Sequence, residues 1–258
     1  MGYGAIGRRL AGFIADGAVG RGEVVATLVR DPDRHAAAER GAWSFVRAGE
    51  DLLAARPDVI VEAAGHDAVR SHVAGFLTAG VDTLIVSIGA MADDELYKEL
   101  RGAAGAGRSR LLLATGAVGS LDALSAARHI GLTEVRHTIR KPRSALGRIP
   151  DPAASTPGGD LIAFAGSARE AALAFPANAN VVAAVAFAGI GLDQTEVRIM
   201  SSPISDRNIH EIHAAGAFGE LDFRIANRSA PDNPRSSLLA AGSLAAALAR
   251  RTAAVVLA

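Results

Sequence analysis

The sequence predicts an α/β protein whose first half is a doubly wound parallel sheet and whose second half is a smaller α+β domain. Three observations predict this fold class. A glycine-spaced turn opens the chain, and short, continuously apolar runs then alternate with helix-like runs up to about residue 115. Apolar strands of this kind are typical of a parallel sheet covered by helices on both faces. Beyond that point, apolar and polar residues alternate, which indicates strands with one exposed face.

The opening turn is Met1-Gly-Tyr-Gly-Ala-Ile-Gly7, in which three glycines have the G-x-G-x-x-G spacing of a dinucleotide-binding Rossmann turn. The chemistry needs glycine for a tight turn, for close approach of the backbone to a pyrophosphate, and for packing of the next helix on a strand. That helix, predicted over 5–15, would point its free N–H groups at the phosphates. The candidate cofactor contacts here are Gly2, Gly4, Ala5, Ile6 and Gly7. Since such a turn normally follows a buried strand, we expect the natural chain to start upstream of this numbering with an apolar first strand.

The rest of the first half is predicted from the periodicity of its apolar residues. We expect strands over 24–29, 42–46, 59–61, 83–88 and 110–114, and helices over 33–40, 51–56, 67–79 and 93–104. Ligands of such sheets bind beyond the carboxyl ends of the strands, which makes Ala64, Gly65, His66 and Ser87 candidate cofactor contacts. Asp31 lies about 20 residues after the turn, where an acid usually bonds the ribose of NAD. The neighbouring Arg30 could instead accept the 2′-phosphate of NADP, so both cofactors stay open.

The second half has a different pattern. We expect helices over 120–130, 167–174, 180–188 and 236–250, and strands over 134–141, 161–165, 196–200, 208–213 and 220–225, the last three antiparallel. Residues 143–159 are rich in Pro, Ser and Gly and are predicted to be a loop. We therefore predict a nucleotide-binding domain over 1–117 and a catalytic domain over 118–235. The final helical segment, 236–258, could return to pack on the first domain.

Composition excludes several classes of function. The formal net charge is zero and no basic block occurs, which argues against nucleic acid as a partner. No run approaches the ~20 apolar residues of a membrane-spanning helix. The chain has no cysteine, which excludes disulfides and thiol nucleophiles and fits a cytoplasmic protein. No His, Asp or Glu spacing suggests a metal site.

Several motifs occur in one order along the chain: Glu62-Ala-Ala-Gly-His66, Ser87-Ile-Gly-Ala90, Thr115-Gly-Ala-Val-Gly-Ser-Leu-Asp-Ala-Leu124, Arg140-Lys-Pro142, Phe175-Pro-Ala-Asn-Ala-Asn-Val181, Ala188-Gly-Ile-Gly-Leu-Asp193, Asn208-Ile-His210, Gly216-Ala-Phe-Gly219 and Asn233-Pro-Arg-Ser-Ser237. Together they resemble the L-aspartate dehydrogenase family. The resemblance covers essentially the whole chain and includes polar residues of both predicted domains.

The resemblance implies a reversible, NAD(P)-dependent oxidative deamination of L-aspartate to iminosuccinate, which can hydrolyse to oxaloacetate and ammonia. It further implies a homodimer and a place in NAD biosynthesis. Carried over by motif, Ala117 and Asn180 match cofactor-binding positions of the family. His210, in Asn-x-His, matches its catalytic residue. We expect the nicotinamide to lie near Ser87, Ala117 and Asn180.

The substrate and the reaction explain why such residues are needed. A histidine titrates near neutral pH and can take a proton from the substrate ammonium or from water. In a strand, Asn208 shares a face with His210 and is a candidate substrate contact. Aspartate carries two carboxylates, so its pocket needs a cation, which Arg140 or Lys141 can supply. Adjacent strand residues point to opposite faces, so we expect one of these two to face the substrate.

Two other classes of function stay open from the sequence. One is a different two-domain NAD(P) oxidoreductase, related to dihydrodipicolinate reductase or homoserine dehydrogenase. The other is a non-catalytic protein that binds NAD(P) and has kept the fold. Assays with several amino acids and oxo acids would distinguish the first alternative from an aspartate dehydrogenase. The second predicts nucleotide binding without turnover of any amino acid.

Overall fold

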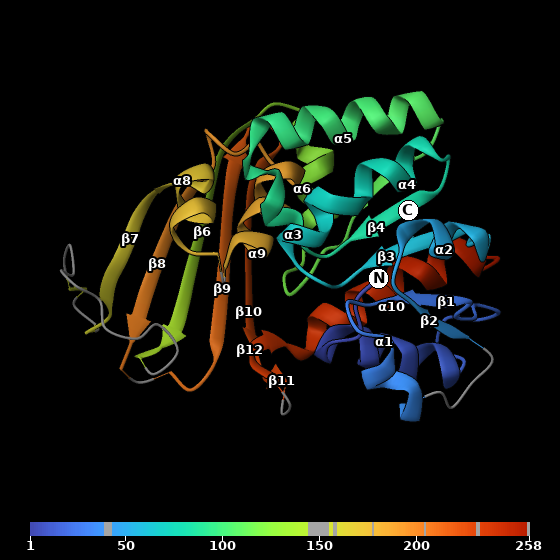
Figure 1. Cartoon of the computed structure of the whole chain (residues 1–258). Helices are drawn as coiled ribbons and strands as arrows, with labels where there is room; N and C mark the ends of the chain where they lie inside the picture. The colour runs from blue at the N-terminus through green and yellow to red at the C-terminus, as the bar shows by residue number, and fades with distance from the viewer. Residues whose placement is uncertain are drawn as a thin grey trace. The chain divides into compact units, whose positions relative to one another are not determined.

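The structure, a computed structural model, describes residues 1–38, 43–143, 155–156, 159–176, 178–203, 205–230 and 233–256. The chain divides into two compact units (Figure 1). Unit 1 comprises Met1–Ala114 and Ala240–Ala258, and unit 2 comprises Thr115–Leu239. Most of the loop predicted over 143–159 lies outside the described residues. Among the described helices, none combines the length and the apolar character that crossing a membrane requires.

Unit 1 contains parallel strands that alternate with helices, as the sequence predicts. Strands β3 (Val59–Glu62), β4 (Asp82–Ile85) and β5 (Leu111–Leu113) form one parallel sheet, and β1 (Ala26–Leu28) and β2 (Ser44–Val46) form a parallel pair. The helices are α1 (Ala5–Ala15), α2 (Gly49–Ala54), α3 (His66–Ala68), α4 (Ala74–Thr78), α5 (Asp94–Gly107) and α10 (Leu238–Thr252). Asp33–Ala38 and Ile88–Ala92 are 3₁₀ turns, and a π-helical turn over Val69–Val73 interrupts the single helix predicted over 67–79.

The first two residues connect β1 with β3. The amino group of Met1 donates to the carbonyl of Val61 at 2.7 Å, and the carbonyl of Met1 accepts from the amide of Ala63 at 3.0 Å. On the other side, the amide of Gly2 donates to the carbonyl of Leu28 at 2.9 Å. A cavity of about 450 Å³ adjoins this connection and is lined by residues of both strands.

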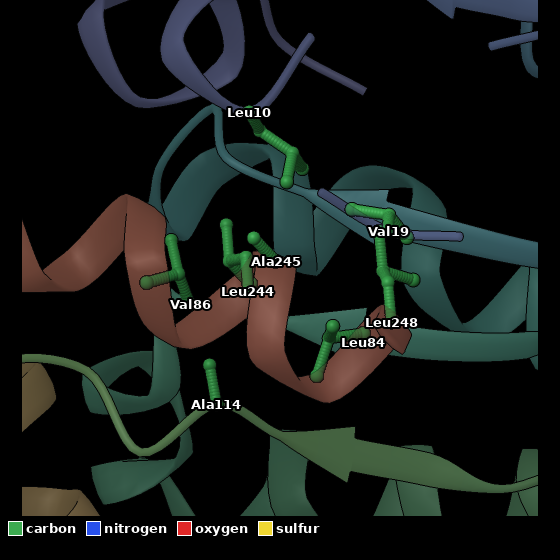
Figure 2. Packing of buried hydrophobic residues seen from close by; sticks show 8 residues of the cluster. All are labelled: Leu10, Val19, Leu84, Val86, Ala114, Leu244, Ala245 and Leu248. Atoms are coloured by element: carbon green, nitrogen blue, oxygen red, sulfur yellow. The ribbon is translucent and has the colours of Figure 1, made fainter. Parts of the chain in front are cut away.

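The core of unit 1 brings the two ends of the chain together (Figure 2). Leu244 and Leu248 of α10 pack in one cluster with Leu10 of α1 and with Leu84 and Val86, which lie in and just after β4. All of these side chains are buried. Because removing a buried leucine side chain costs about 2–5 kcal/mol, α10 is a structural part of this unit.

Unit 2 is a five-stranded mixed sheet with helices packed on it. Its strand order is β10-β9-β6-β8-β7, with bounds Leu132–Pro142 for β6, Leu161–Ser167 for β7, Glu196–Ser202 for β8, Asn208–Gly216 for β9 and Gly219–Asn227 for β10. Helices α6 (Leu121–Arg128), α8 (Ala168–Ala174) and α9 (Ala179–Ala188) pack against these strands. Short strands β11 (Ser229–Ala230) and β12 (Asn233–Ser237) form a separate pair. Ser167 caps α8 and forms a capping box with Glu170.

The pairing of β8 agrees with the prediction only in part. The strand predicted over 196–200 was expected to be antiparallel, and β8 pairs antiparallel with β7 but parallel with β6. The connection from β7 to β8 contains helices α8 and α9, and β8 returns between β6 and β7. Alternation of apolar residues reports which face of a strand is buried and carries no information on its direction, so the sequence pattern could not settle this point.

Candidate functional site

The glycine turn of unit 1 has the shape that a pyrophosphate requires. Gly2 has a φ of +87°, and a Cβ there would come within 2.7 Å of the carbonyl oxygen of Ala63. A Cβ at Gly7 would overlap the carbonyl oxygen of Gly2, whereas one at Gly4 would have no atom within 4 Å. Gly4 caps α1 without a side-chain hydrogen bond, and no acidic residue lies in the first turn. The N-terminus of α1 is therefore open, and the positive end of its helix dipole suits an anionic group of a dinucleotide.

Glu62, at the end of β3, organises the neighbouring strand ends. Its fully buried carboxylate accepts from the amides of Ala64 at 2.7 Å and Gly65 at 2.8 Å. It also accepts from the amide of Ser87 at 3.0 Å and from the hydroxyl of Ser87 at 2.9 Å. These bonds turn the chain after β4, which ends at Ile85 rather than at residue 88 as predicted. Glu62 thus fixes three of the predicted cofactor positions.

The other predicted contacts of unit 1 lie after the ends of β1, β3 and β4. Asp31 follows β1 and its carboxylate lies 3.9 Å from the Nε of the exposed Arg34. Gly65 has a φ of +118° and precedes α3, which begins at His66. The hydroxyl of Ser87 is engaged by Glu62, so a cofactor contact there would use other atoms of the residue.

In unit 2, His210 forms a buried pair with another histidine. His210 lies in β9 and is directly opposite Ile139 of β6, so both side chains are on one face of the sheet. His137, two residues before Ile139, shares that face. The Nε2 of His137 lies 3.2 Å from the Nδ1 of His210, and both rings are buried.

Burial and a nearby cation control the charge of this pair. Burial, followed by the positive charge of Lys141, lowers the pKa of His210 from 6.5 to about 4. Burial and then the neighbouring His210 lower the pKa of His137 well below its usual value. Burial also lowers the pKa of Lys141. At neutral pH both imidazoles are therefore neutral, and His210 is able to accept a proton.

The structure separates Arg140 from Lys141. Lys141 lies on the same face of β6 as His137, opposite Ser201 of β8. Arg140 lies on the other face, where its guanidinium pairs with Asp160 at 3.0 Å and with Glu211. Arg140 therefore does not share the face of His210, because strand alternation turns it away, and two carboxylates already engage it; its role as a substrate contact stays a prediction.

Further polar groups gather on the face that carries His210. The Oδ1 of Asn208 and the Oγ of Ser201 are buried and have no hydrogen-bond partner among the described residues. Asn227 of β10, opposite Asn208, donates its amide to the carbonyl of Ala117 at 2.7 Å. Ala117 is buried, and Asn180 is the second residue of α9. Unsatisfied buried polar atoms are rare in folded proteins, and here they provide hydrogen-bonding groups for a polar ligand.

Sequence reasoning missed three residues of these sites: Glu62, His137 and Asn227. Alternation along β6 places His137 on the same face as Lys141, and this could have been predicted from the sequence. Its pairing with His210 depends on the register of β6 and β9, which the sequence does not reveal. Within the described ranges, no group of three or more His, Asp or Glu side chains is placed to hold a metal ion.

Comparisons with known proteins match both units. Residues 122–251 match the family model described as aspartate dehydrogenase, C-terminal, and residues 2–114 match the model described as homoserine dehydrogenase, NAD binding domain. An L-aspartate dehydrogenase of Ruegeria pomeroyi is 44% identical over 260 residues, which cover 99% of this chain and 92% of the relative. One of Pseudomonas aeruginosa is 43% identical over 211 residues, covering 78% of this chain and 76% of the relative.

A solved structure has the same fold. The crystal structure of aspartate dehydrogenase from Thermotoga maritima superposes with a TM-score of 0.78 and covers 100% of this chain and 97% of that one, at 23% sequence identity. This likeness, together with the match of residues 2–114 to a nucleotide-binding domain, confirms the predicted fold class.

Proposed function

The chain belongs to the aspartate dehydrogenase family, and from this premise we propose that it catalyses the NAD(P)-dependent oxidation of L-aspartate to iminosuccinate. The observation that carries the proposal is in unit 2. A neutral, buried His210 lies on one sheet face with the cation Lys141 and with unsatisfied polar atoms of Asn208 and Ser201. A dicarboxylic amino acid needs both a proton acceptor and a cation.

Unit 1 supplies the cofactor-binding residues. Gly4 leaves open space for the pyrophosphate, Gly2 and Gly7 allow the backbone of the turn to pack closely, and the start of α1 supplies amide donors. In this proposal Asp31 binds the adenosine ribose, while Glu62 holds Ala64, Gly65 and Ser87 in position. When bound, the nicotinamide supplies the hydride acceptor. The choice between NAD and NADP stays a prediction that rests on Asp31 and Arg30.

Unit 2 supplies the groups that handle the substrate. Oxidation removes a hydride from Cα and one proton from the substrate nitrogen, so one C–H and one N–H bond break and a C=N bond forms. His210 accepts that proton, or the proton of the water that later attacks the imine. Lys141 binds a carboxylate by charge, and Asn208 orients the substrate by hydrogen bonding. In this proposal, Ala117 and Asn180 contact the cofactor.

The proton-acceptor role is tested by replacing His210. Aspartate-dependent reduction of NAD(P), followed at the nicotinamide absorbance, should fall by ~100-fold or more in His210→Ala. Binding of the reduced cofactor, measured by fluorescence, should change little because the glycine turn is intact. A variant that turns over aspartate at a near-normal rate would exclude this role.

The carboxylate role is tested with a pair of neighbouring cations. Lys141→Met should raise the KM for aspartate by ~10-fold or more, because an ion pair to the substrate is lost. Arg140→Met is the matched control: it removes a cation from the other face of the same strand and should leave that KM within about twofold. Equal effects of the two variants would contradict the assignment.

A homodimer that uses the sheet of unit 2 is also part of this proposal. The sheet face opposite His210 carries side chains of both signs, among them Arg136, Glu211, Asp222 and Arg224, which line a hollow of about 350 Å³. Mixed charges of this kind are compatible with a self-complementary interface. Light scattering should give twice the chain mass, and Arg224→Glu should lower it; a monomeric wild type would refute the dimer. Cytoplasmic location and a role in NAD biosynthesis stay predictions.

A further inference from the structure

His137 is a buried polar residue that the reaction outlined above does not use. It has no exposed surface, and its Nδ1 has no hydrogen-bond partner among the described residues. Its Nε2 lies 3.2 Å from the Nδ1 of His210. The ring centroids are 5.3 Å apart and the rings are inclined by 36°, so the contact joins two ring nitrogens at hydrogen-bond distance. A buried imidazole in a sheet core is costly compared with an apolar side chain, which calls for an explanation.

The contact restricts how both rings carry their hydrogens. A neutral imidazole has one N–H donor and one acceptor nitrogen. If His137 donated from Nε2, the neutral His210 would carry its hydrogen on its own Nε2 and could accept nothing there. If His137 accepts at Nε2, His210 carries its hydrogen on Nδ1 and its Nε2 keeps a lone pair. A proton acceptor needs the second arrangement.

The same arrangement is required after the proton has been accepted. The imidazolium form of His210 has N–H donors on both nitrogens, and its Nδ1–H points at His137. Among the described residues of this sheet face, the other titratable group is Lys141, which as a cation cannot accept a hydrogen bond. On the neighbouring strand β10, the residue opposite His210 is Ile225; α9 contains no titratable residue, and Asp122 and Arg128 of α6 are exposed. His137 is therefore the group placed to receive this hydrogen.

We propose that His137 is a positioning residue for His210: its Nε2 accepts the Nδ1–H of His210, so that the Nε2 of His210 exchanges protons with the substrate. This inference rests on the proposed function, because it assumes that His210 is the proton acceptor. The hydrogen of His137 then lies on Nδ1. The role resembles that of a residue that orients a catalytic base in a hydrolase triad, with a neutral ring in place of a carboxylate.

A matched pair of variants separates the hydrogen bond from the volume of the side chain. His137→Met fills similar space without a strong acceptor, whereas His137→Gln places an amide oxygen near the former Nε2. In His137→Met, kcat should fall ~10-fold, while the KM for aspartate stays within about threefold. The imidazolium of His210 loses its acceptor, its pKa falls, and the acid limb of kcat/KM moves to lower pH. His137→Gln should restore both kcat and the acid limb towards the wild-type values.

The outcomes distinguish this inference from the proposed function. If His210→Ala loses turnover but His137→Met matches the wild type in kcat and in the acid limb, the inference is overturned and the proposed function stands. If His210→Ala keeps its turnover, both are overturned. Should His137→Met fail to fold, ¹⁵N-histidine spectra of the wild type at neutral pH decide the question. Hydrogen on the Nδ1 of His210 supports the inference, and hydrogen on the Nε2 of both rings overturns it.

Discussion

Replacing Glu62 by glutamine should loosen the strand ends of unit 1, and the size of the effect follows from its hydrogen bonds. The amides of Ala64 and Gly65 and the hydroxyl of Ser87 all donate to Oε1, while the amide of Ser87 donates to Oε2 at 3.0 Å. A glutamine can keep the first three bonds with its carbonyl oxygen. Its NH₂ group then faces the amide of Ser87, donor against donor. Losing a charge-assisted hydrogen bond and burying unsatisfied donors should together cost about 3 kcal/mol.

Fluorescence provides a direct assay of this prediction. The single tryptophan of the chain, Trp43, lies in unit 1 beside β2, so its emission follows the unfolding of that unit in urea. Glu99→Gln, on the exposed side of α5, is the control and should change the unfolding free energy by less than about 0.5 kcal/mol. The affinity for the reduced cofactor should fall in Glu62→Gln as well. Unchanged stability and affinity in Glu62→Gln would refute the assignment of Glu62 as the residue that organises these strand ends.

Three further predictions concern glycine, pH and an ion pair. Gly7→Ala should destabilise unit 1 by at least about 2 kcal/mol in urea, because its Cβ overlaps backbone; Gly4→Ala should keep the stability and weaken cofactor binding, since its Cβ points into open space. The pKa of His210 in the folded protein, about 4, lies below its unfolded value of 6.5. Above pH 6.5 the histidine is neutral in both states, so its titration does not change the free energy of unfolding. As pH falls from 6.5 towards 4, the unfolded state binds the proton first, so the free energy of unfolding falls by about 3 kcal/mol. Unfolding followed by circular dichroism should show a smaller fall in His210→Gln. Asp82→Asn should lower the unfolding free energy by about 1 kcal/mol at neutral pH, because the carboxylate of Asp82 bonds two arginine side chains. The expected loss is small because these arginines are partly or largely exposed, and a change below about 0.3 kcal/mol would contradict the prediction.

Local patterns in the sequence predicted the fold well and the substrate residues in part. The glycine spacing and the helix over 5–15 follow from local sterics and periodicity, and α1 spans Ala5–Ala15. Alternation in β9 placed His210 on one face with Asn208, and the structure adds that His210 is buried there. Alternation also predicts that Arg140 and Lys141 point to opposite faces of their strand. Which of the two shares a face with His210 depends on the register of β6 and β9. The contact with His137 joins residues 73 positions apart, so it follows from the register as well.

The carboxylate of Glu62 binds backbone amides that follow two different strands of unit 1, which bears on how cofactor binding would register in solution. The amides of Ala64 and Gly65 follow β3, and that of Ser87 follows β4. An amide hydrogen held by a buried carboxylate exchanges with solvent only when that bond opens, so exchange at these three amides should be slow and should change together. A dinucleotide that touches this edge of the sheet would slow their exchange further, and the size of that change would measure how much of its binding energy goes into ordering these strand ends.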